Sequence, residues 1–169
     1  MVLTKEELIG TLQHELRILL HLASKIDPAK LDYRPSAKQR SLLELLQYLT
    51  IMGPIHLRTV KEGVFNMDAW SKAWRTEQAV AKTRNLEQVK EELKKQPALF
   101  AEIINSCSDA DMRAEIALFG NKASRGYWFV WLGLSHYAAY RMQLFLYLKA
   151  CGRDELSTLN LWAAMDPPK

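Results

Sequence analysis

The stretch that most constrains the fold runs from residue 127 to residue 151, YWFVWLGLSHYAAYRMQLFLYLKAC. Its only charged residues are Arg141 and Lys149. Apolar residues occupy nearly every face at helical spacing, which predicts a helix enclosed by other elements. The uncharged run ends at Arg141 after fourteen residues, short of the roughly 20 that span a bilayer. We therefore expect a central core helix and no membrane partner.

The composition is typical of one globular domain, residues 1–169. A chain of this length can bury a sizeable core, and 25% charged residues are an ordinary share. Cys107 and Cys151 form no C-x-x-C pair, which argues against a disulfide framework and against a cysteine zinc site. The first residues, MVLTKEEL, lack the apolar core of a secretory signal. We therefore expect a cytoplasmic protein.

Three more helices are predicted ahead of this segment, each opened by a capping box. An apolar residue recurs every three or four positions after each start, as on one face of a helix. Gly53 and Pro54 interrupt the second pattern, which predicts a kink there. The four helices are predicted over about residues 4–26, 41–61, 85–106 and 127–151, and the boxes are Thr4 with Glu7, Ser41 with Glu44 and Asn85 with Gln88.

The connection over residues 61–84 is the longest between these helices. It contains Phe65, Trp70 and Trp74 but no clear helix start and stop, and we expect its aromatic side chains to cover the core or a neighbouring subunit. It is long enough to cross the end of a bundle. No strand pair is expected anywhere in the chain. The pattern predicts an all-α fold, a four-helix bundle with a long crossover between its second and third helices.

Several chemistries are excluded by missing motifs. Glycine-rich phosphate loops, G-x-S-x-G and H-E-x-x-H are absent, and no paired carboxylates fall on the apolar faces. The net charge of +4 is scattered and interleaved with acids, so no nucleic-acid partner is expected. The candidate site is therefore limited to polar residues inside the core helix, and these are His136, Tyr140, Arg141 and Gln143.

Three segments carry a resemblance to a known family. These are LDYRPSAKQR, RSLLELLQYL and HYAAYRMQLFLYLKACG, and with the helix order they make the chain resemble the DinB/YfiT-like superfamily. That superfamily includes damage-inducible proteins, metal-dependent hydrolases and thiol S-transferases. The resemblance implies up-down-down-up topology and a homodimer. It also implies a divalent metal held by three histidines, one from the second helix and two from the fourth.

In this chain the histidine triad of the family is degenerate. The three positions fall on Tyr48, His136 and Tyr140, and Arg141 and Gln143 match the end of the fourth-helix motif. A phenol with a pKa near 10 must lose its proton before it binds a metal, and one histidine does not hold zinc or nickel. We therefore predict no metal and no cofactor. The two phenols and His136 are expected to hydrogen-bond one another or water, and Arg141 is expected to be a structural donor.

Two functions are compatible with this pattern. The first is a metal-free homodimer that binds a small molecule or a partner. The alternative is a metal-dependent thiol S-transferase-type enzyme that uses His136 with an unexpected ligand such as His56. The spacing argues against His56, because it lies eight residues beyond Tyr48, about 12 Å along a regular helix. A lone histidine on an apolar stripe is more often a hydrogen-bonded core residue than a metal ligand.

Overall fold

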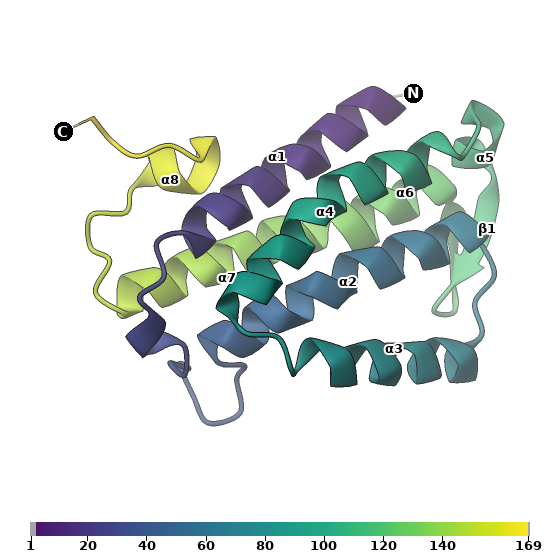
Figure 1. The fold of residues 1–169 in the computed structure, drawn as a ribbon. Coiled ribbons are helices and arrows are strands. Elements are labelled where there is room, and N and C mark those ends of the chain that lie inside the picture. The colour runs from purple at the N-terminus through teal and green to yellow at the C-terminus, as the bar shows by residue number, and fades with distance from the viewer. Residues whose placement is uncertain (1–2, 169) are drawn as a thin grey trace.

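The computed structural model describes residues 3–168 and shows the predicted all-helical class in its main body (Figure 1). Four long helical segments pack together. The fourth is a composite, because α6 continues through a π-helical turn, η2, into α7. The bounds of these segments are α1 Lys5–Ala23, α2 Leu42–Glu62, α4 Leu86–Asn105, α6 Arg125–Phe129, η2 Val130–Ser135 and α7 His136–Ala150.

Short elements complete the described chain. Figure 1 shows α3 along the outside of the bundle, beside α2, returning the chain to the end at which α2 begins. Over residues 3–168 no helix combines the length and the apolar character needed to cross a membrane. The short elements are η1 Pro28–Lys30, α3 Met67–Ala81, α5 Asp109–Arg113, β1 Glu115–Leu118, β2 Asn121–Ser124 and α8 Thr158–Ala163.

The crossover forms a helix that the sequence pattern does not delimit. Asn66 opens α3 by accepting a hydrogen bond from the Ala69 N–H, as asparagine commonly does at an N-cap. Ala81 is the one buried residue of this helix. Trp70 and Trp74 are half-buried and pack on α2, so α3 contacts the bundle mainly through its aromatic side chains.

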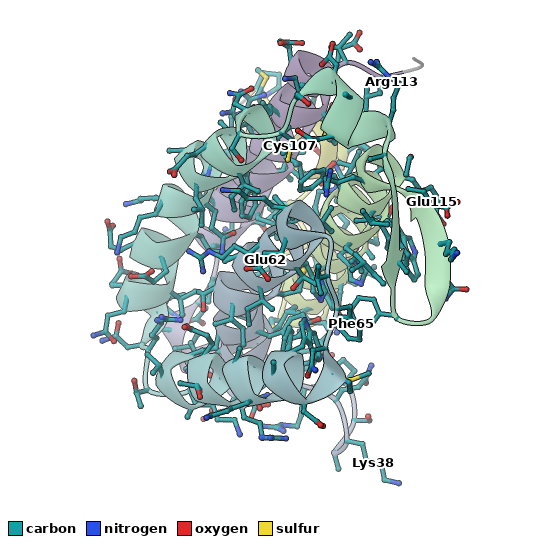
Figure 2. The ribbon with its side chains drawn as sticks, turned by 90° about the vertical axis from the view of Figure 1, so that its right-hand side faces the viewer. Lys38, Glu62, Phe65, Cys107, Arg113 and Glu115 are labelled. Atoms are coloured by element: carbon teal, nitrogen blue, oxygen red, sulfur yellow. The ribbon has the colours of Figure 1, made fainter. Side chains whose placement is uncertain are left out.

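The prediction that the chain lacks a strand pair is wrong. β1 and β2 pair antiparallel across a turn at Phe119 and Gly120, whose φ angles of 51° and 79° are left-handed, as a two-residue hairpin turn requires. The ring of Phe119 lies 4.3 Å from that of Phe65 between centroids. Figure 2 looks at this end of the bundle and shows Phe65 close to the hairpin. The hairpin therefore closes the bundle beside the start of α3.

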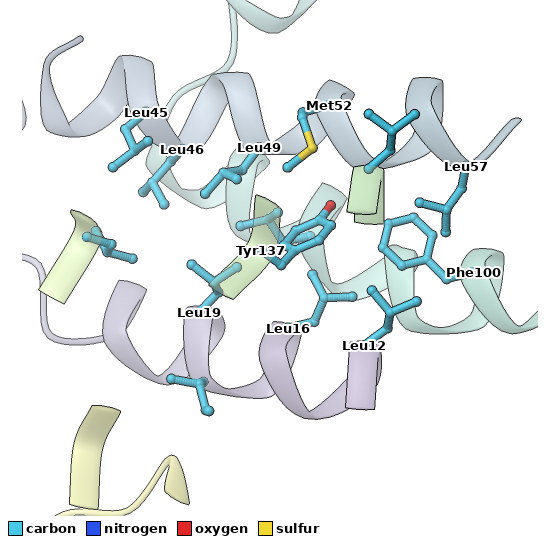
Figure 3. Packing of buried hydrophobic residues seen from close by; sticks show 14 of the residues in the cluster. Leu12, Leu16, Leu19, Leu45, Leu46, Leu49, Met52, Leu57, Phe100 and Tyr137 are labelled. Atoms are coloured by element: carbon cyan, nitrogen blue, oxygen red, sulfur yellow. The ribbon is translucent and has the colours of Figure 1, made fainter. Parts of the chain in front are cut away.

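The core is built mainly from leucine, with Tyr137 at its centre. Figure 3 shows this ring enclosed by leucines of α1 and α2 and by Phe100 of α4. The Tyr137 side chain is fully buried, so its hydroxyl needs a partner. It donates to Oε1 of Gln96 over 2.6 Å. This hydrogen bond ties the fourth helical segment to α4 inside the apolar core.

Gln96 also explains how α2 tolerates a proline. α2 runs unbroken past Gly53-Pro54, so the predicted interruption does not end the helix. Pro54 has no N–H, which leaves the carbonyl of Thr50 without its helical donor. Nε2 of Gln96 donates to that carbonyl over 3.1 Å, and to the Leu49 carbonyl over 3.0 Å. A side chain of α4 thus replaces the missing backbone donor.

Gly53 is required by this close packing, and its replacement gives a first test. A Cβ atom at this position would collide with the Tyr137 hydroxyl and lie 2.6 Å from Cζ of Phe100. Although alanine is favoured over glycine in helices by about 1 kcal/mol, overpacking a core costs about 1–3 kcal/mol. Gly53→Ala is therefore expected to lower the free energy of unfolding, measured by urea denaturation. Gly10→Ala is the matched control, because nothing lies within 4 Å of its added methyl group; it should be stabilising or neutral.

The C-terminal segment is tied to the bundle by Arg141. Its Nε lies 3.2 Å from Oε2 of Glu15, and its Nη1 donates to the carbonyl of Leu161, near the end of α8, over 3.2 Å. Its guanidinium also covers the ring of Trp162 at 4.2 Å. Arg141 therefore forms a buried ion pair with Glu15 and donates a hydrogen bond to a carbonyl near a helix end, so the prediction that it is a structural donor is confirmed for the carbonyl.

Candidate functional site

Two pairs of polar aromatic side chains meet where α2 faces the fourth helical segment. The Tyr140 hydroxyl donates to that of Tyr48 over 3.3 Å, and their ring centroids are 5.1 Å apart. Further along α2, the ring centroids of His56 and His136 lie 5.2 Å apart, and the ring planes are inclined at 70°. The two helices run antiparallel, so Tyr48 on α2 faces Tyr140 on α7, and His56, later on α2, faces His136, earlier on α7. The site is a row of four rings between two helices.

The π-helical turn fixes how both imidazoles are protonated. Nδ1 of His136 contacts the Trp131 carbonyl at 2.9 Å, and Nδ1 of His56 contacts the Leu132 carbonyl at 3.2 Å. A carbonyl only accepts, so Nδ1 of each ring carries a hydrogen, and a ring without a second hydrogen keeps a lone pair on Nε2. Neither Nε2 has a hydrogen-bond partner among the described residues. The π-turn therefore anchors both imidazole rings through Nδ1 and leaves each Nε2 free of hydrogen bonds to the described residues. Turns of this kind are frequent at functional sites.

His56 is held in its neutral form. Burial lowers its pKa to about 4, and the nearby His136 lowers it further than the hydrogen bond to the Leu132 carbonyl raises it. Burial disfavours a charged imidazole because the protein interior solvates charge poorly. At neutral pH this ring is therefore an acceptor at Nε2 and carries no charge.

Tyr48 also stays protonated at neutral pH. Burial raises the pKa of Tyr48 well above its ordinary value, and the hydrogen bond with Tyr140 raises it further. The guanidinium of Arg40 lies 4.0 Å from the centre of the Tyr48 ring and acts in the opposite direction. A phenol that keeps its proton is a hydrogen-bonding group and not an anionic ligand.

Two indoles from α3 cover the row. The rings of Trp70 and Trp74 stack at 5.0 Å and 25°. His56 lies 5.8 Å from Trp74 and 6.4 Å from Trp70, and Tyr48 lies 5.7 Å from Trp74. These contacts join the four rings into one continuous group. We call this group, together with two rings of the fourth helical segment, the aromatic cluster; its members are Tyr48, His56, Trp70, Trp74, His136 and Tyr140.

Two grooves flank the aromatic cluster between α2 and α3. One, of about 470 Å3, is lined by Trp70, Phe65, Ile55 and Arg58 among others. The other, of about 140 Å3, is lined by Tyr48, Arg40, Gln47 and Lys82 among others. Trp70 has a buried Nε1 with no hydrogen-bond partner among the described residues. The cluster thus borders open space at two places, through Trp70 in the first groove and through Tyr48 in the second.

The donor set does not fit the divalent metal implied by the family resemblance. Within residues 3–168 no three histidine, cysteine, aspartate or glutamate side chains are placed to hold a metal ion. Zinc sites normally use at least three protein ligands. The site offers two imidazoles and two phenols, and a protonated phenol is a poor metal ligand. We therefore assign no metal chemistry to these residues.

The predicted site residues fall into two groups. Tyr48, His136 and Tyr140 come together as the resemblance implies, but His136 bonds to the Trp131 carbonyl and not to the phenols. Arg141 does not join them, because its guanidinium is buried against Glu15. Gln143 lies two turns beyond His136 and donates to the Tyr147 hydroxyl over 2.8 Å. Only three of the five predicted pocket residues therefore belong to the aromatic cluster.

His56 lies close to His136, with ring centroids 5.2 Å apart, although its spacing from Tyr48 argued against such a contact. Its distance along α2 from Tyr48 is not the relevant quantity, because His136 itself lies a turn away from Tyr140 on the opposing helix. Sequence reasoning also missed the roles of Trp70 and Trp74 at the site. The available signal was that Trp70 and Trp74 are four residues apart, on one face of a helix that Asn66 can cap.

The comparisons with known proteins concern the fold alone. No family model and no curated protein matches the chain. Its structure is similar to the crystal structure of a DinB-like protein, YjoA, from Bacillus subtilis, with a TM-score of 0.66 and 19% sequence identity. The match covers 89% of this chain and 94% of that one. The protein therefore has the DinB-like fold that its sequence resembles.

Proposed function

We propose that this protein binds a small molecule at the aromatic cluster without a divalent metal, and that it works as a cytoplasmic homodimer. One observation carries the proposal: Tyr48 and Tyr140 stand at two positions where the resemblance implies histidine ligands, and their hydroxyls bond to each other. Burial keeps Tyr48 protonated. The metal positions of the family have thus become part of a hydrogen-bonded aromatic surface.

The chemistry of the cluster indicates the class of ligand. Indole and phenol faces favour a flat ring, and Nε2 of the neutral His56 ring accepts a hydrogen bond. Because His56 is neutral, it offers no positive charge to an anion. The best match is a small, flat, uncharged molecule that carries O–H or N–H donors.

Resorcinol is a suitable probe, because it is a flat ring with two O–H donors. It is expected to bind with millimolar affinity and to shift the indole N–H signals of Trp70 and Trp74 in NMR spectra, whereas benzoate should bind at least about tenfold more weakly. His56→Phe keeps an aromatic ring but removes the acceptor, and losing one hydrogen bond costs about 1 kcal/mol, or several-fold in affinity. His14→Phe, outside the cluster, is the matched control. Equal binding of both probes would contradict the assignment.

The absence of a functional metal is tested on the same protein. Purified without a histidine tag, it should contain far less than one nickel or zinc per chain. The double variant Tyr48→His, Tyr140→His supplies the missing imidazoles and is expected to bind one nickel ion per chain in calorimetry. A stoichiometric metal in the unchanged protein would overturn the proposal.

That outcome would favour a second candidate, a metal-dependent thiol S-transferase-type enzyme. One observation supports it: the rings of His56 and His136 are 5.2 Å apart, with Nδ1 of each anchored to a backbone carbonyl. Metal-binding histidines are commonly anchored in this way. The pair supplies two imidazoles only, so this candidate needs a further ligand from outside the described contacts.

A further inference from the structure

The acceptor that the proposed function assigns to the ligand is covered by α3. His56 is only 6% exposed, and the indoles of Trp70 and Trp74 lie against its ring, with centroids at 6.4 and 5.8 Å. Neither of the two grooves between α2 and α3 is lined by His56. A ring-sized molecule can therefore stack on these indoles and reach Nε2 of His56 only if α3 moves away from α2.

α3 is attached to the bundle without polar contacts. Over residues 67–81, all of which the structure describes, no group forms a hydrogen bond or salt bridge with another helix or strand. Figure 1 shows this helix outside the four long segments, and Ala81 is its one buried residue. Segments with few buried apolar contacts open at a lower free energy than the core does. α3 therefore has the properties of a unit that opens while the bundle stays folded.

The C-terminal end of α3 is fixed to buried groups of α2. Nε2 of Gln47 donates to the carbonyls of Lys82 and Arg84 over 3.2 and 2.7 Å. Nη1 of Arg84 donates in turn to Oγ1 of Thr50 over 2.6 Å. Ala81, which is 2% exposed, is buried beside this joint. The turn that follows α3 is therefore held in place and can serve as a pivot.

The N-terminal end of α3 has no such joint. Residues 64–66 form neither helix nor strand, and their backbone N–H groups donate to no described residue. This end is held by ring contacts, chiefly that of Phe65 with Phe119 of the hairpin. The larger groove, of about 470 Å3, lies beside this half of α3 and is lined by Phe65 and Trp70 among others. The Trp70 half of α3 is therefore packed less closely on α2 than the half that ends at the pivot.

The closed position of α3 also leaves a donor unpaired. Nε1 of Trp70 is buried and has no hydrogen-bond partner among the described residues. Such a group disfavours the conformation that buries it, because its N–H loses water and gains no protein acceptor. If the N-terminal half of α3 lifts, this N–H and Nε2 of His56 both become available to a ligand.

We propose that α3 is a lid that pivots at residues 82–84 and lifts at its Met67 end to admit the ligand to the aromatic cluster. The inference rests on the small-molecule binding of the proposed function and identifies what controls access to that site. Trp70 moves farther than Trp74, because it lies farther from the pivot. Its displacement opens a space of the size of an indole next to His56, which fits a flat ring.

Thiol labelling measures the opening without any ligand. In a Cys151→Ser background, His56→Cys places a thiol behind the indoles, and Cys107, 4% exposed just beyond α4, is the internal reference for opening of the bundle. Methyl methanethiosulfonate is expected to label the first thiol at least about tenfold faster than Cys107, as resolved by mass spectrometry. Phe65→Ala removes the ring contact with the hairpin and should raise that rate about fivefold. Val64→Ala is the matched control, because Val64 is 77% exposed, and it should leave the rate unchanged.

A covalent lock tests whether the opening admits the ligand. Arg58 on α2 and Ala73 on α3 are exposed and line the larger groove from its two sides. In a Cys151→Ser background, Arg58→Cys with Ala73→Cys is joined by a short bis-maleimide, which holds α3 against α2. The matched control is the same variant capped with two molecules of N-ethylmaleimide, which leave α3 free to move. The lock is expected to weaken resorcinol binding at least about tenfold relative to the capped protein.

The outcomes separate the lid from the proposed function. Binding to the capped protein and not to the locked one supports both. Equal binding to the two overturns the lid and leaves the small-molecule site standing. If no form binds resorcinol, the proposed ligand is wrong, and the labelling rates alone decide the lid: the fast, Phe65-dependent reaction of the His56→Cys thiol supports it, and a rate no faster than that of Cys107 overturns it.

Discussion

Replacing Arg141 by methionine is expected to lower the free energy of unfolding by about 3–5 kcal/mol at pH 7. The Arg141 and Glu15 side chains are 4% and 8% exposed, and Nε of the arginine lies 3.2 Å from the glutamate. The variant leaves the Glu15 carboxylate buried without its cation, which is far more costly than losing an exposed ion pair. It also removes the donor to the Leu161 carbonyl, which ties α8 to the bundle.

The pH dependence of this loss identifies its cause. Burial already raises the pKa of Glu15, and the charge of Arg141 opposes that rise. Without Arg141 the carboxyl takes up its proton at higher pH in the folded protein than in the unfolded chain. The deficit of the variant should therefore shrink as the pH falls toward about 4, where the unfolded carboxyl is protonated as well.

Two further variants control the Arg141 experiment. The free energy of unfolding of each protein is measured by urea denaturation. Arg75→Met on the exposed surface of α3 is expected to change stability by no more than about 0.5 kcal/mol. The double variant Glu15→Met, Arg141→Met replaces the whole pair by apolar groups and should recover most of the loss. A double variant as unstable as Arg141→Met alone would show that packing around the guanidinium, and not the stranded carboxylate, causes the effect.

Helix starts could be predicted because their signals are local. The boxes at Thr4, Ser41 and Asn85 form as the sequence indicates, each N-cap oxygen accepting from an N–H three residues later. Such a contact needs only a few neighbouring residues and no tertiary partner. The same reasoning failed for the strands of the hairpin. Gly120 and Asn121 indicate a turn, but each strand has only four residues and is too short to be recognised by its pattern.

Contacts between helices were less accessible to sequence reasoning. Tyr48 and Tyr140 could be paired only through the family resemblance, which supplied the register of α2 against α7. The eight residues between Tyr48 and His56 do not predict the contact of His56 with His136, because spacing along one helix does not give the distance across two antiparallel helices. The π-helical turn that anchors both imidazoles has no signal in the sequence, since it depends on how the segment packs.

The exposed side of the fourth helical segment shows a related limit. A segment with apolar residues on nearly every side predicts burial, but the sequence cannot distinguish burial within one chain from burial between two chains. Trp131 and Leu146 satisfy the helical pattern of a core helix, yet the other elements of the described chain leave them in solvent. The same pattern can therefore indicate either a core or an interface, and only the fold separates them.

The stability of the protein is expected to fall by about 3 kcal/mol between pH 7 and pH 4 through His56 alone. Its pKa is about 4 in the folded protein and about 6.5 in an unfolded chain. Above pH 6.5 the imidazole is neutral in both states and contributes no pH dependence. Below that pH the unfolded chain takes up a proton that the folded protein refuses, so stability is lost as the pH falls until about pH 4.

His56→Asn isolates this contribution, because its amide can donate to the Leu132 carbonyl as Nδ1 does and does not titrate. Acidic groups and His21 contribute to the pH dependence of both proteins, so the quantity of interest is the difference between the two unfolding free energies at each pH. That difference is expected to change by about 3 kcal/mol from pH 7 to pH 4 in favour of the variant. A constant difference would mean that the folded protein protonates His56 at its ordinary pKa. Burial between His136 and the indoles of Trp70 and Trp74 would then not exclude the charge, and the acceptor role assigned to His56 would be lost with it.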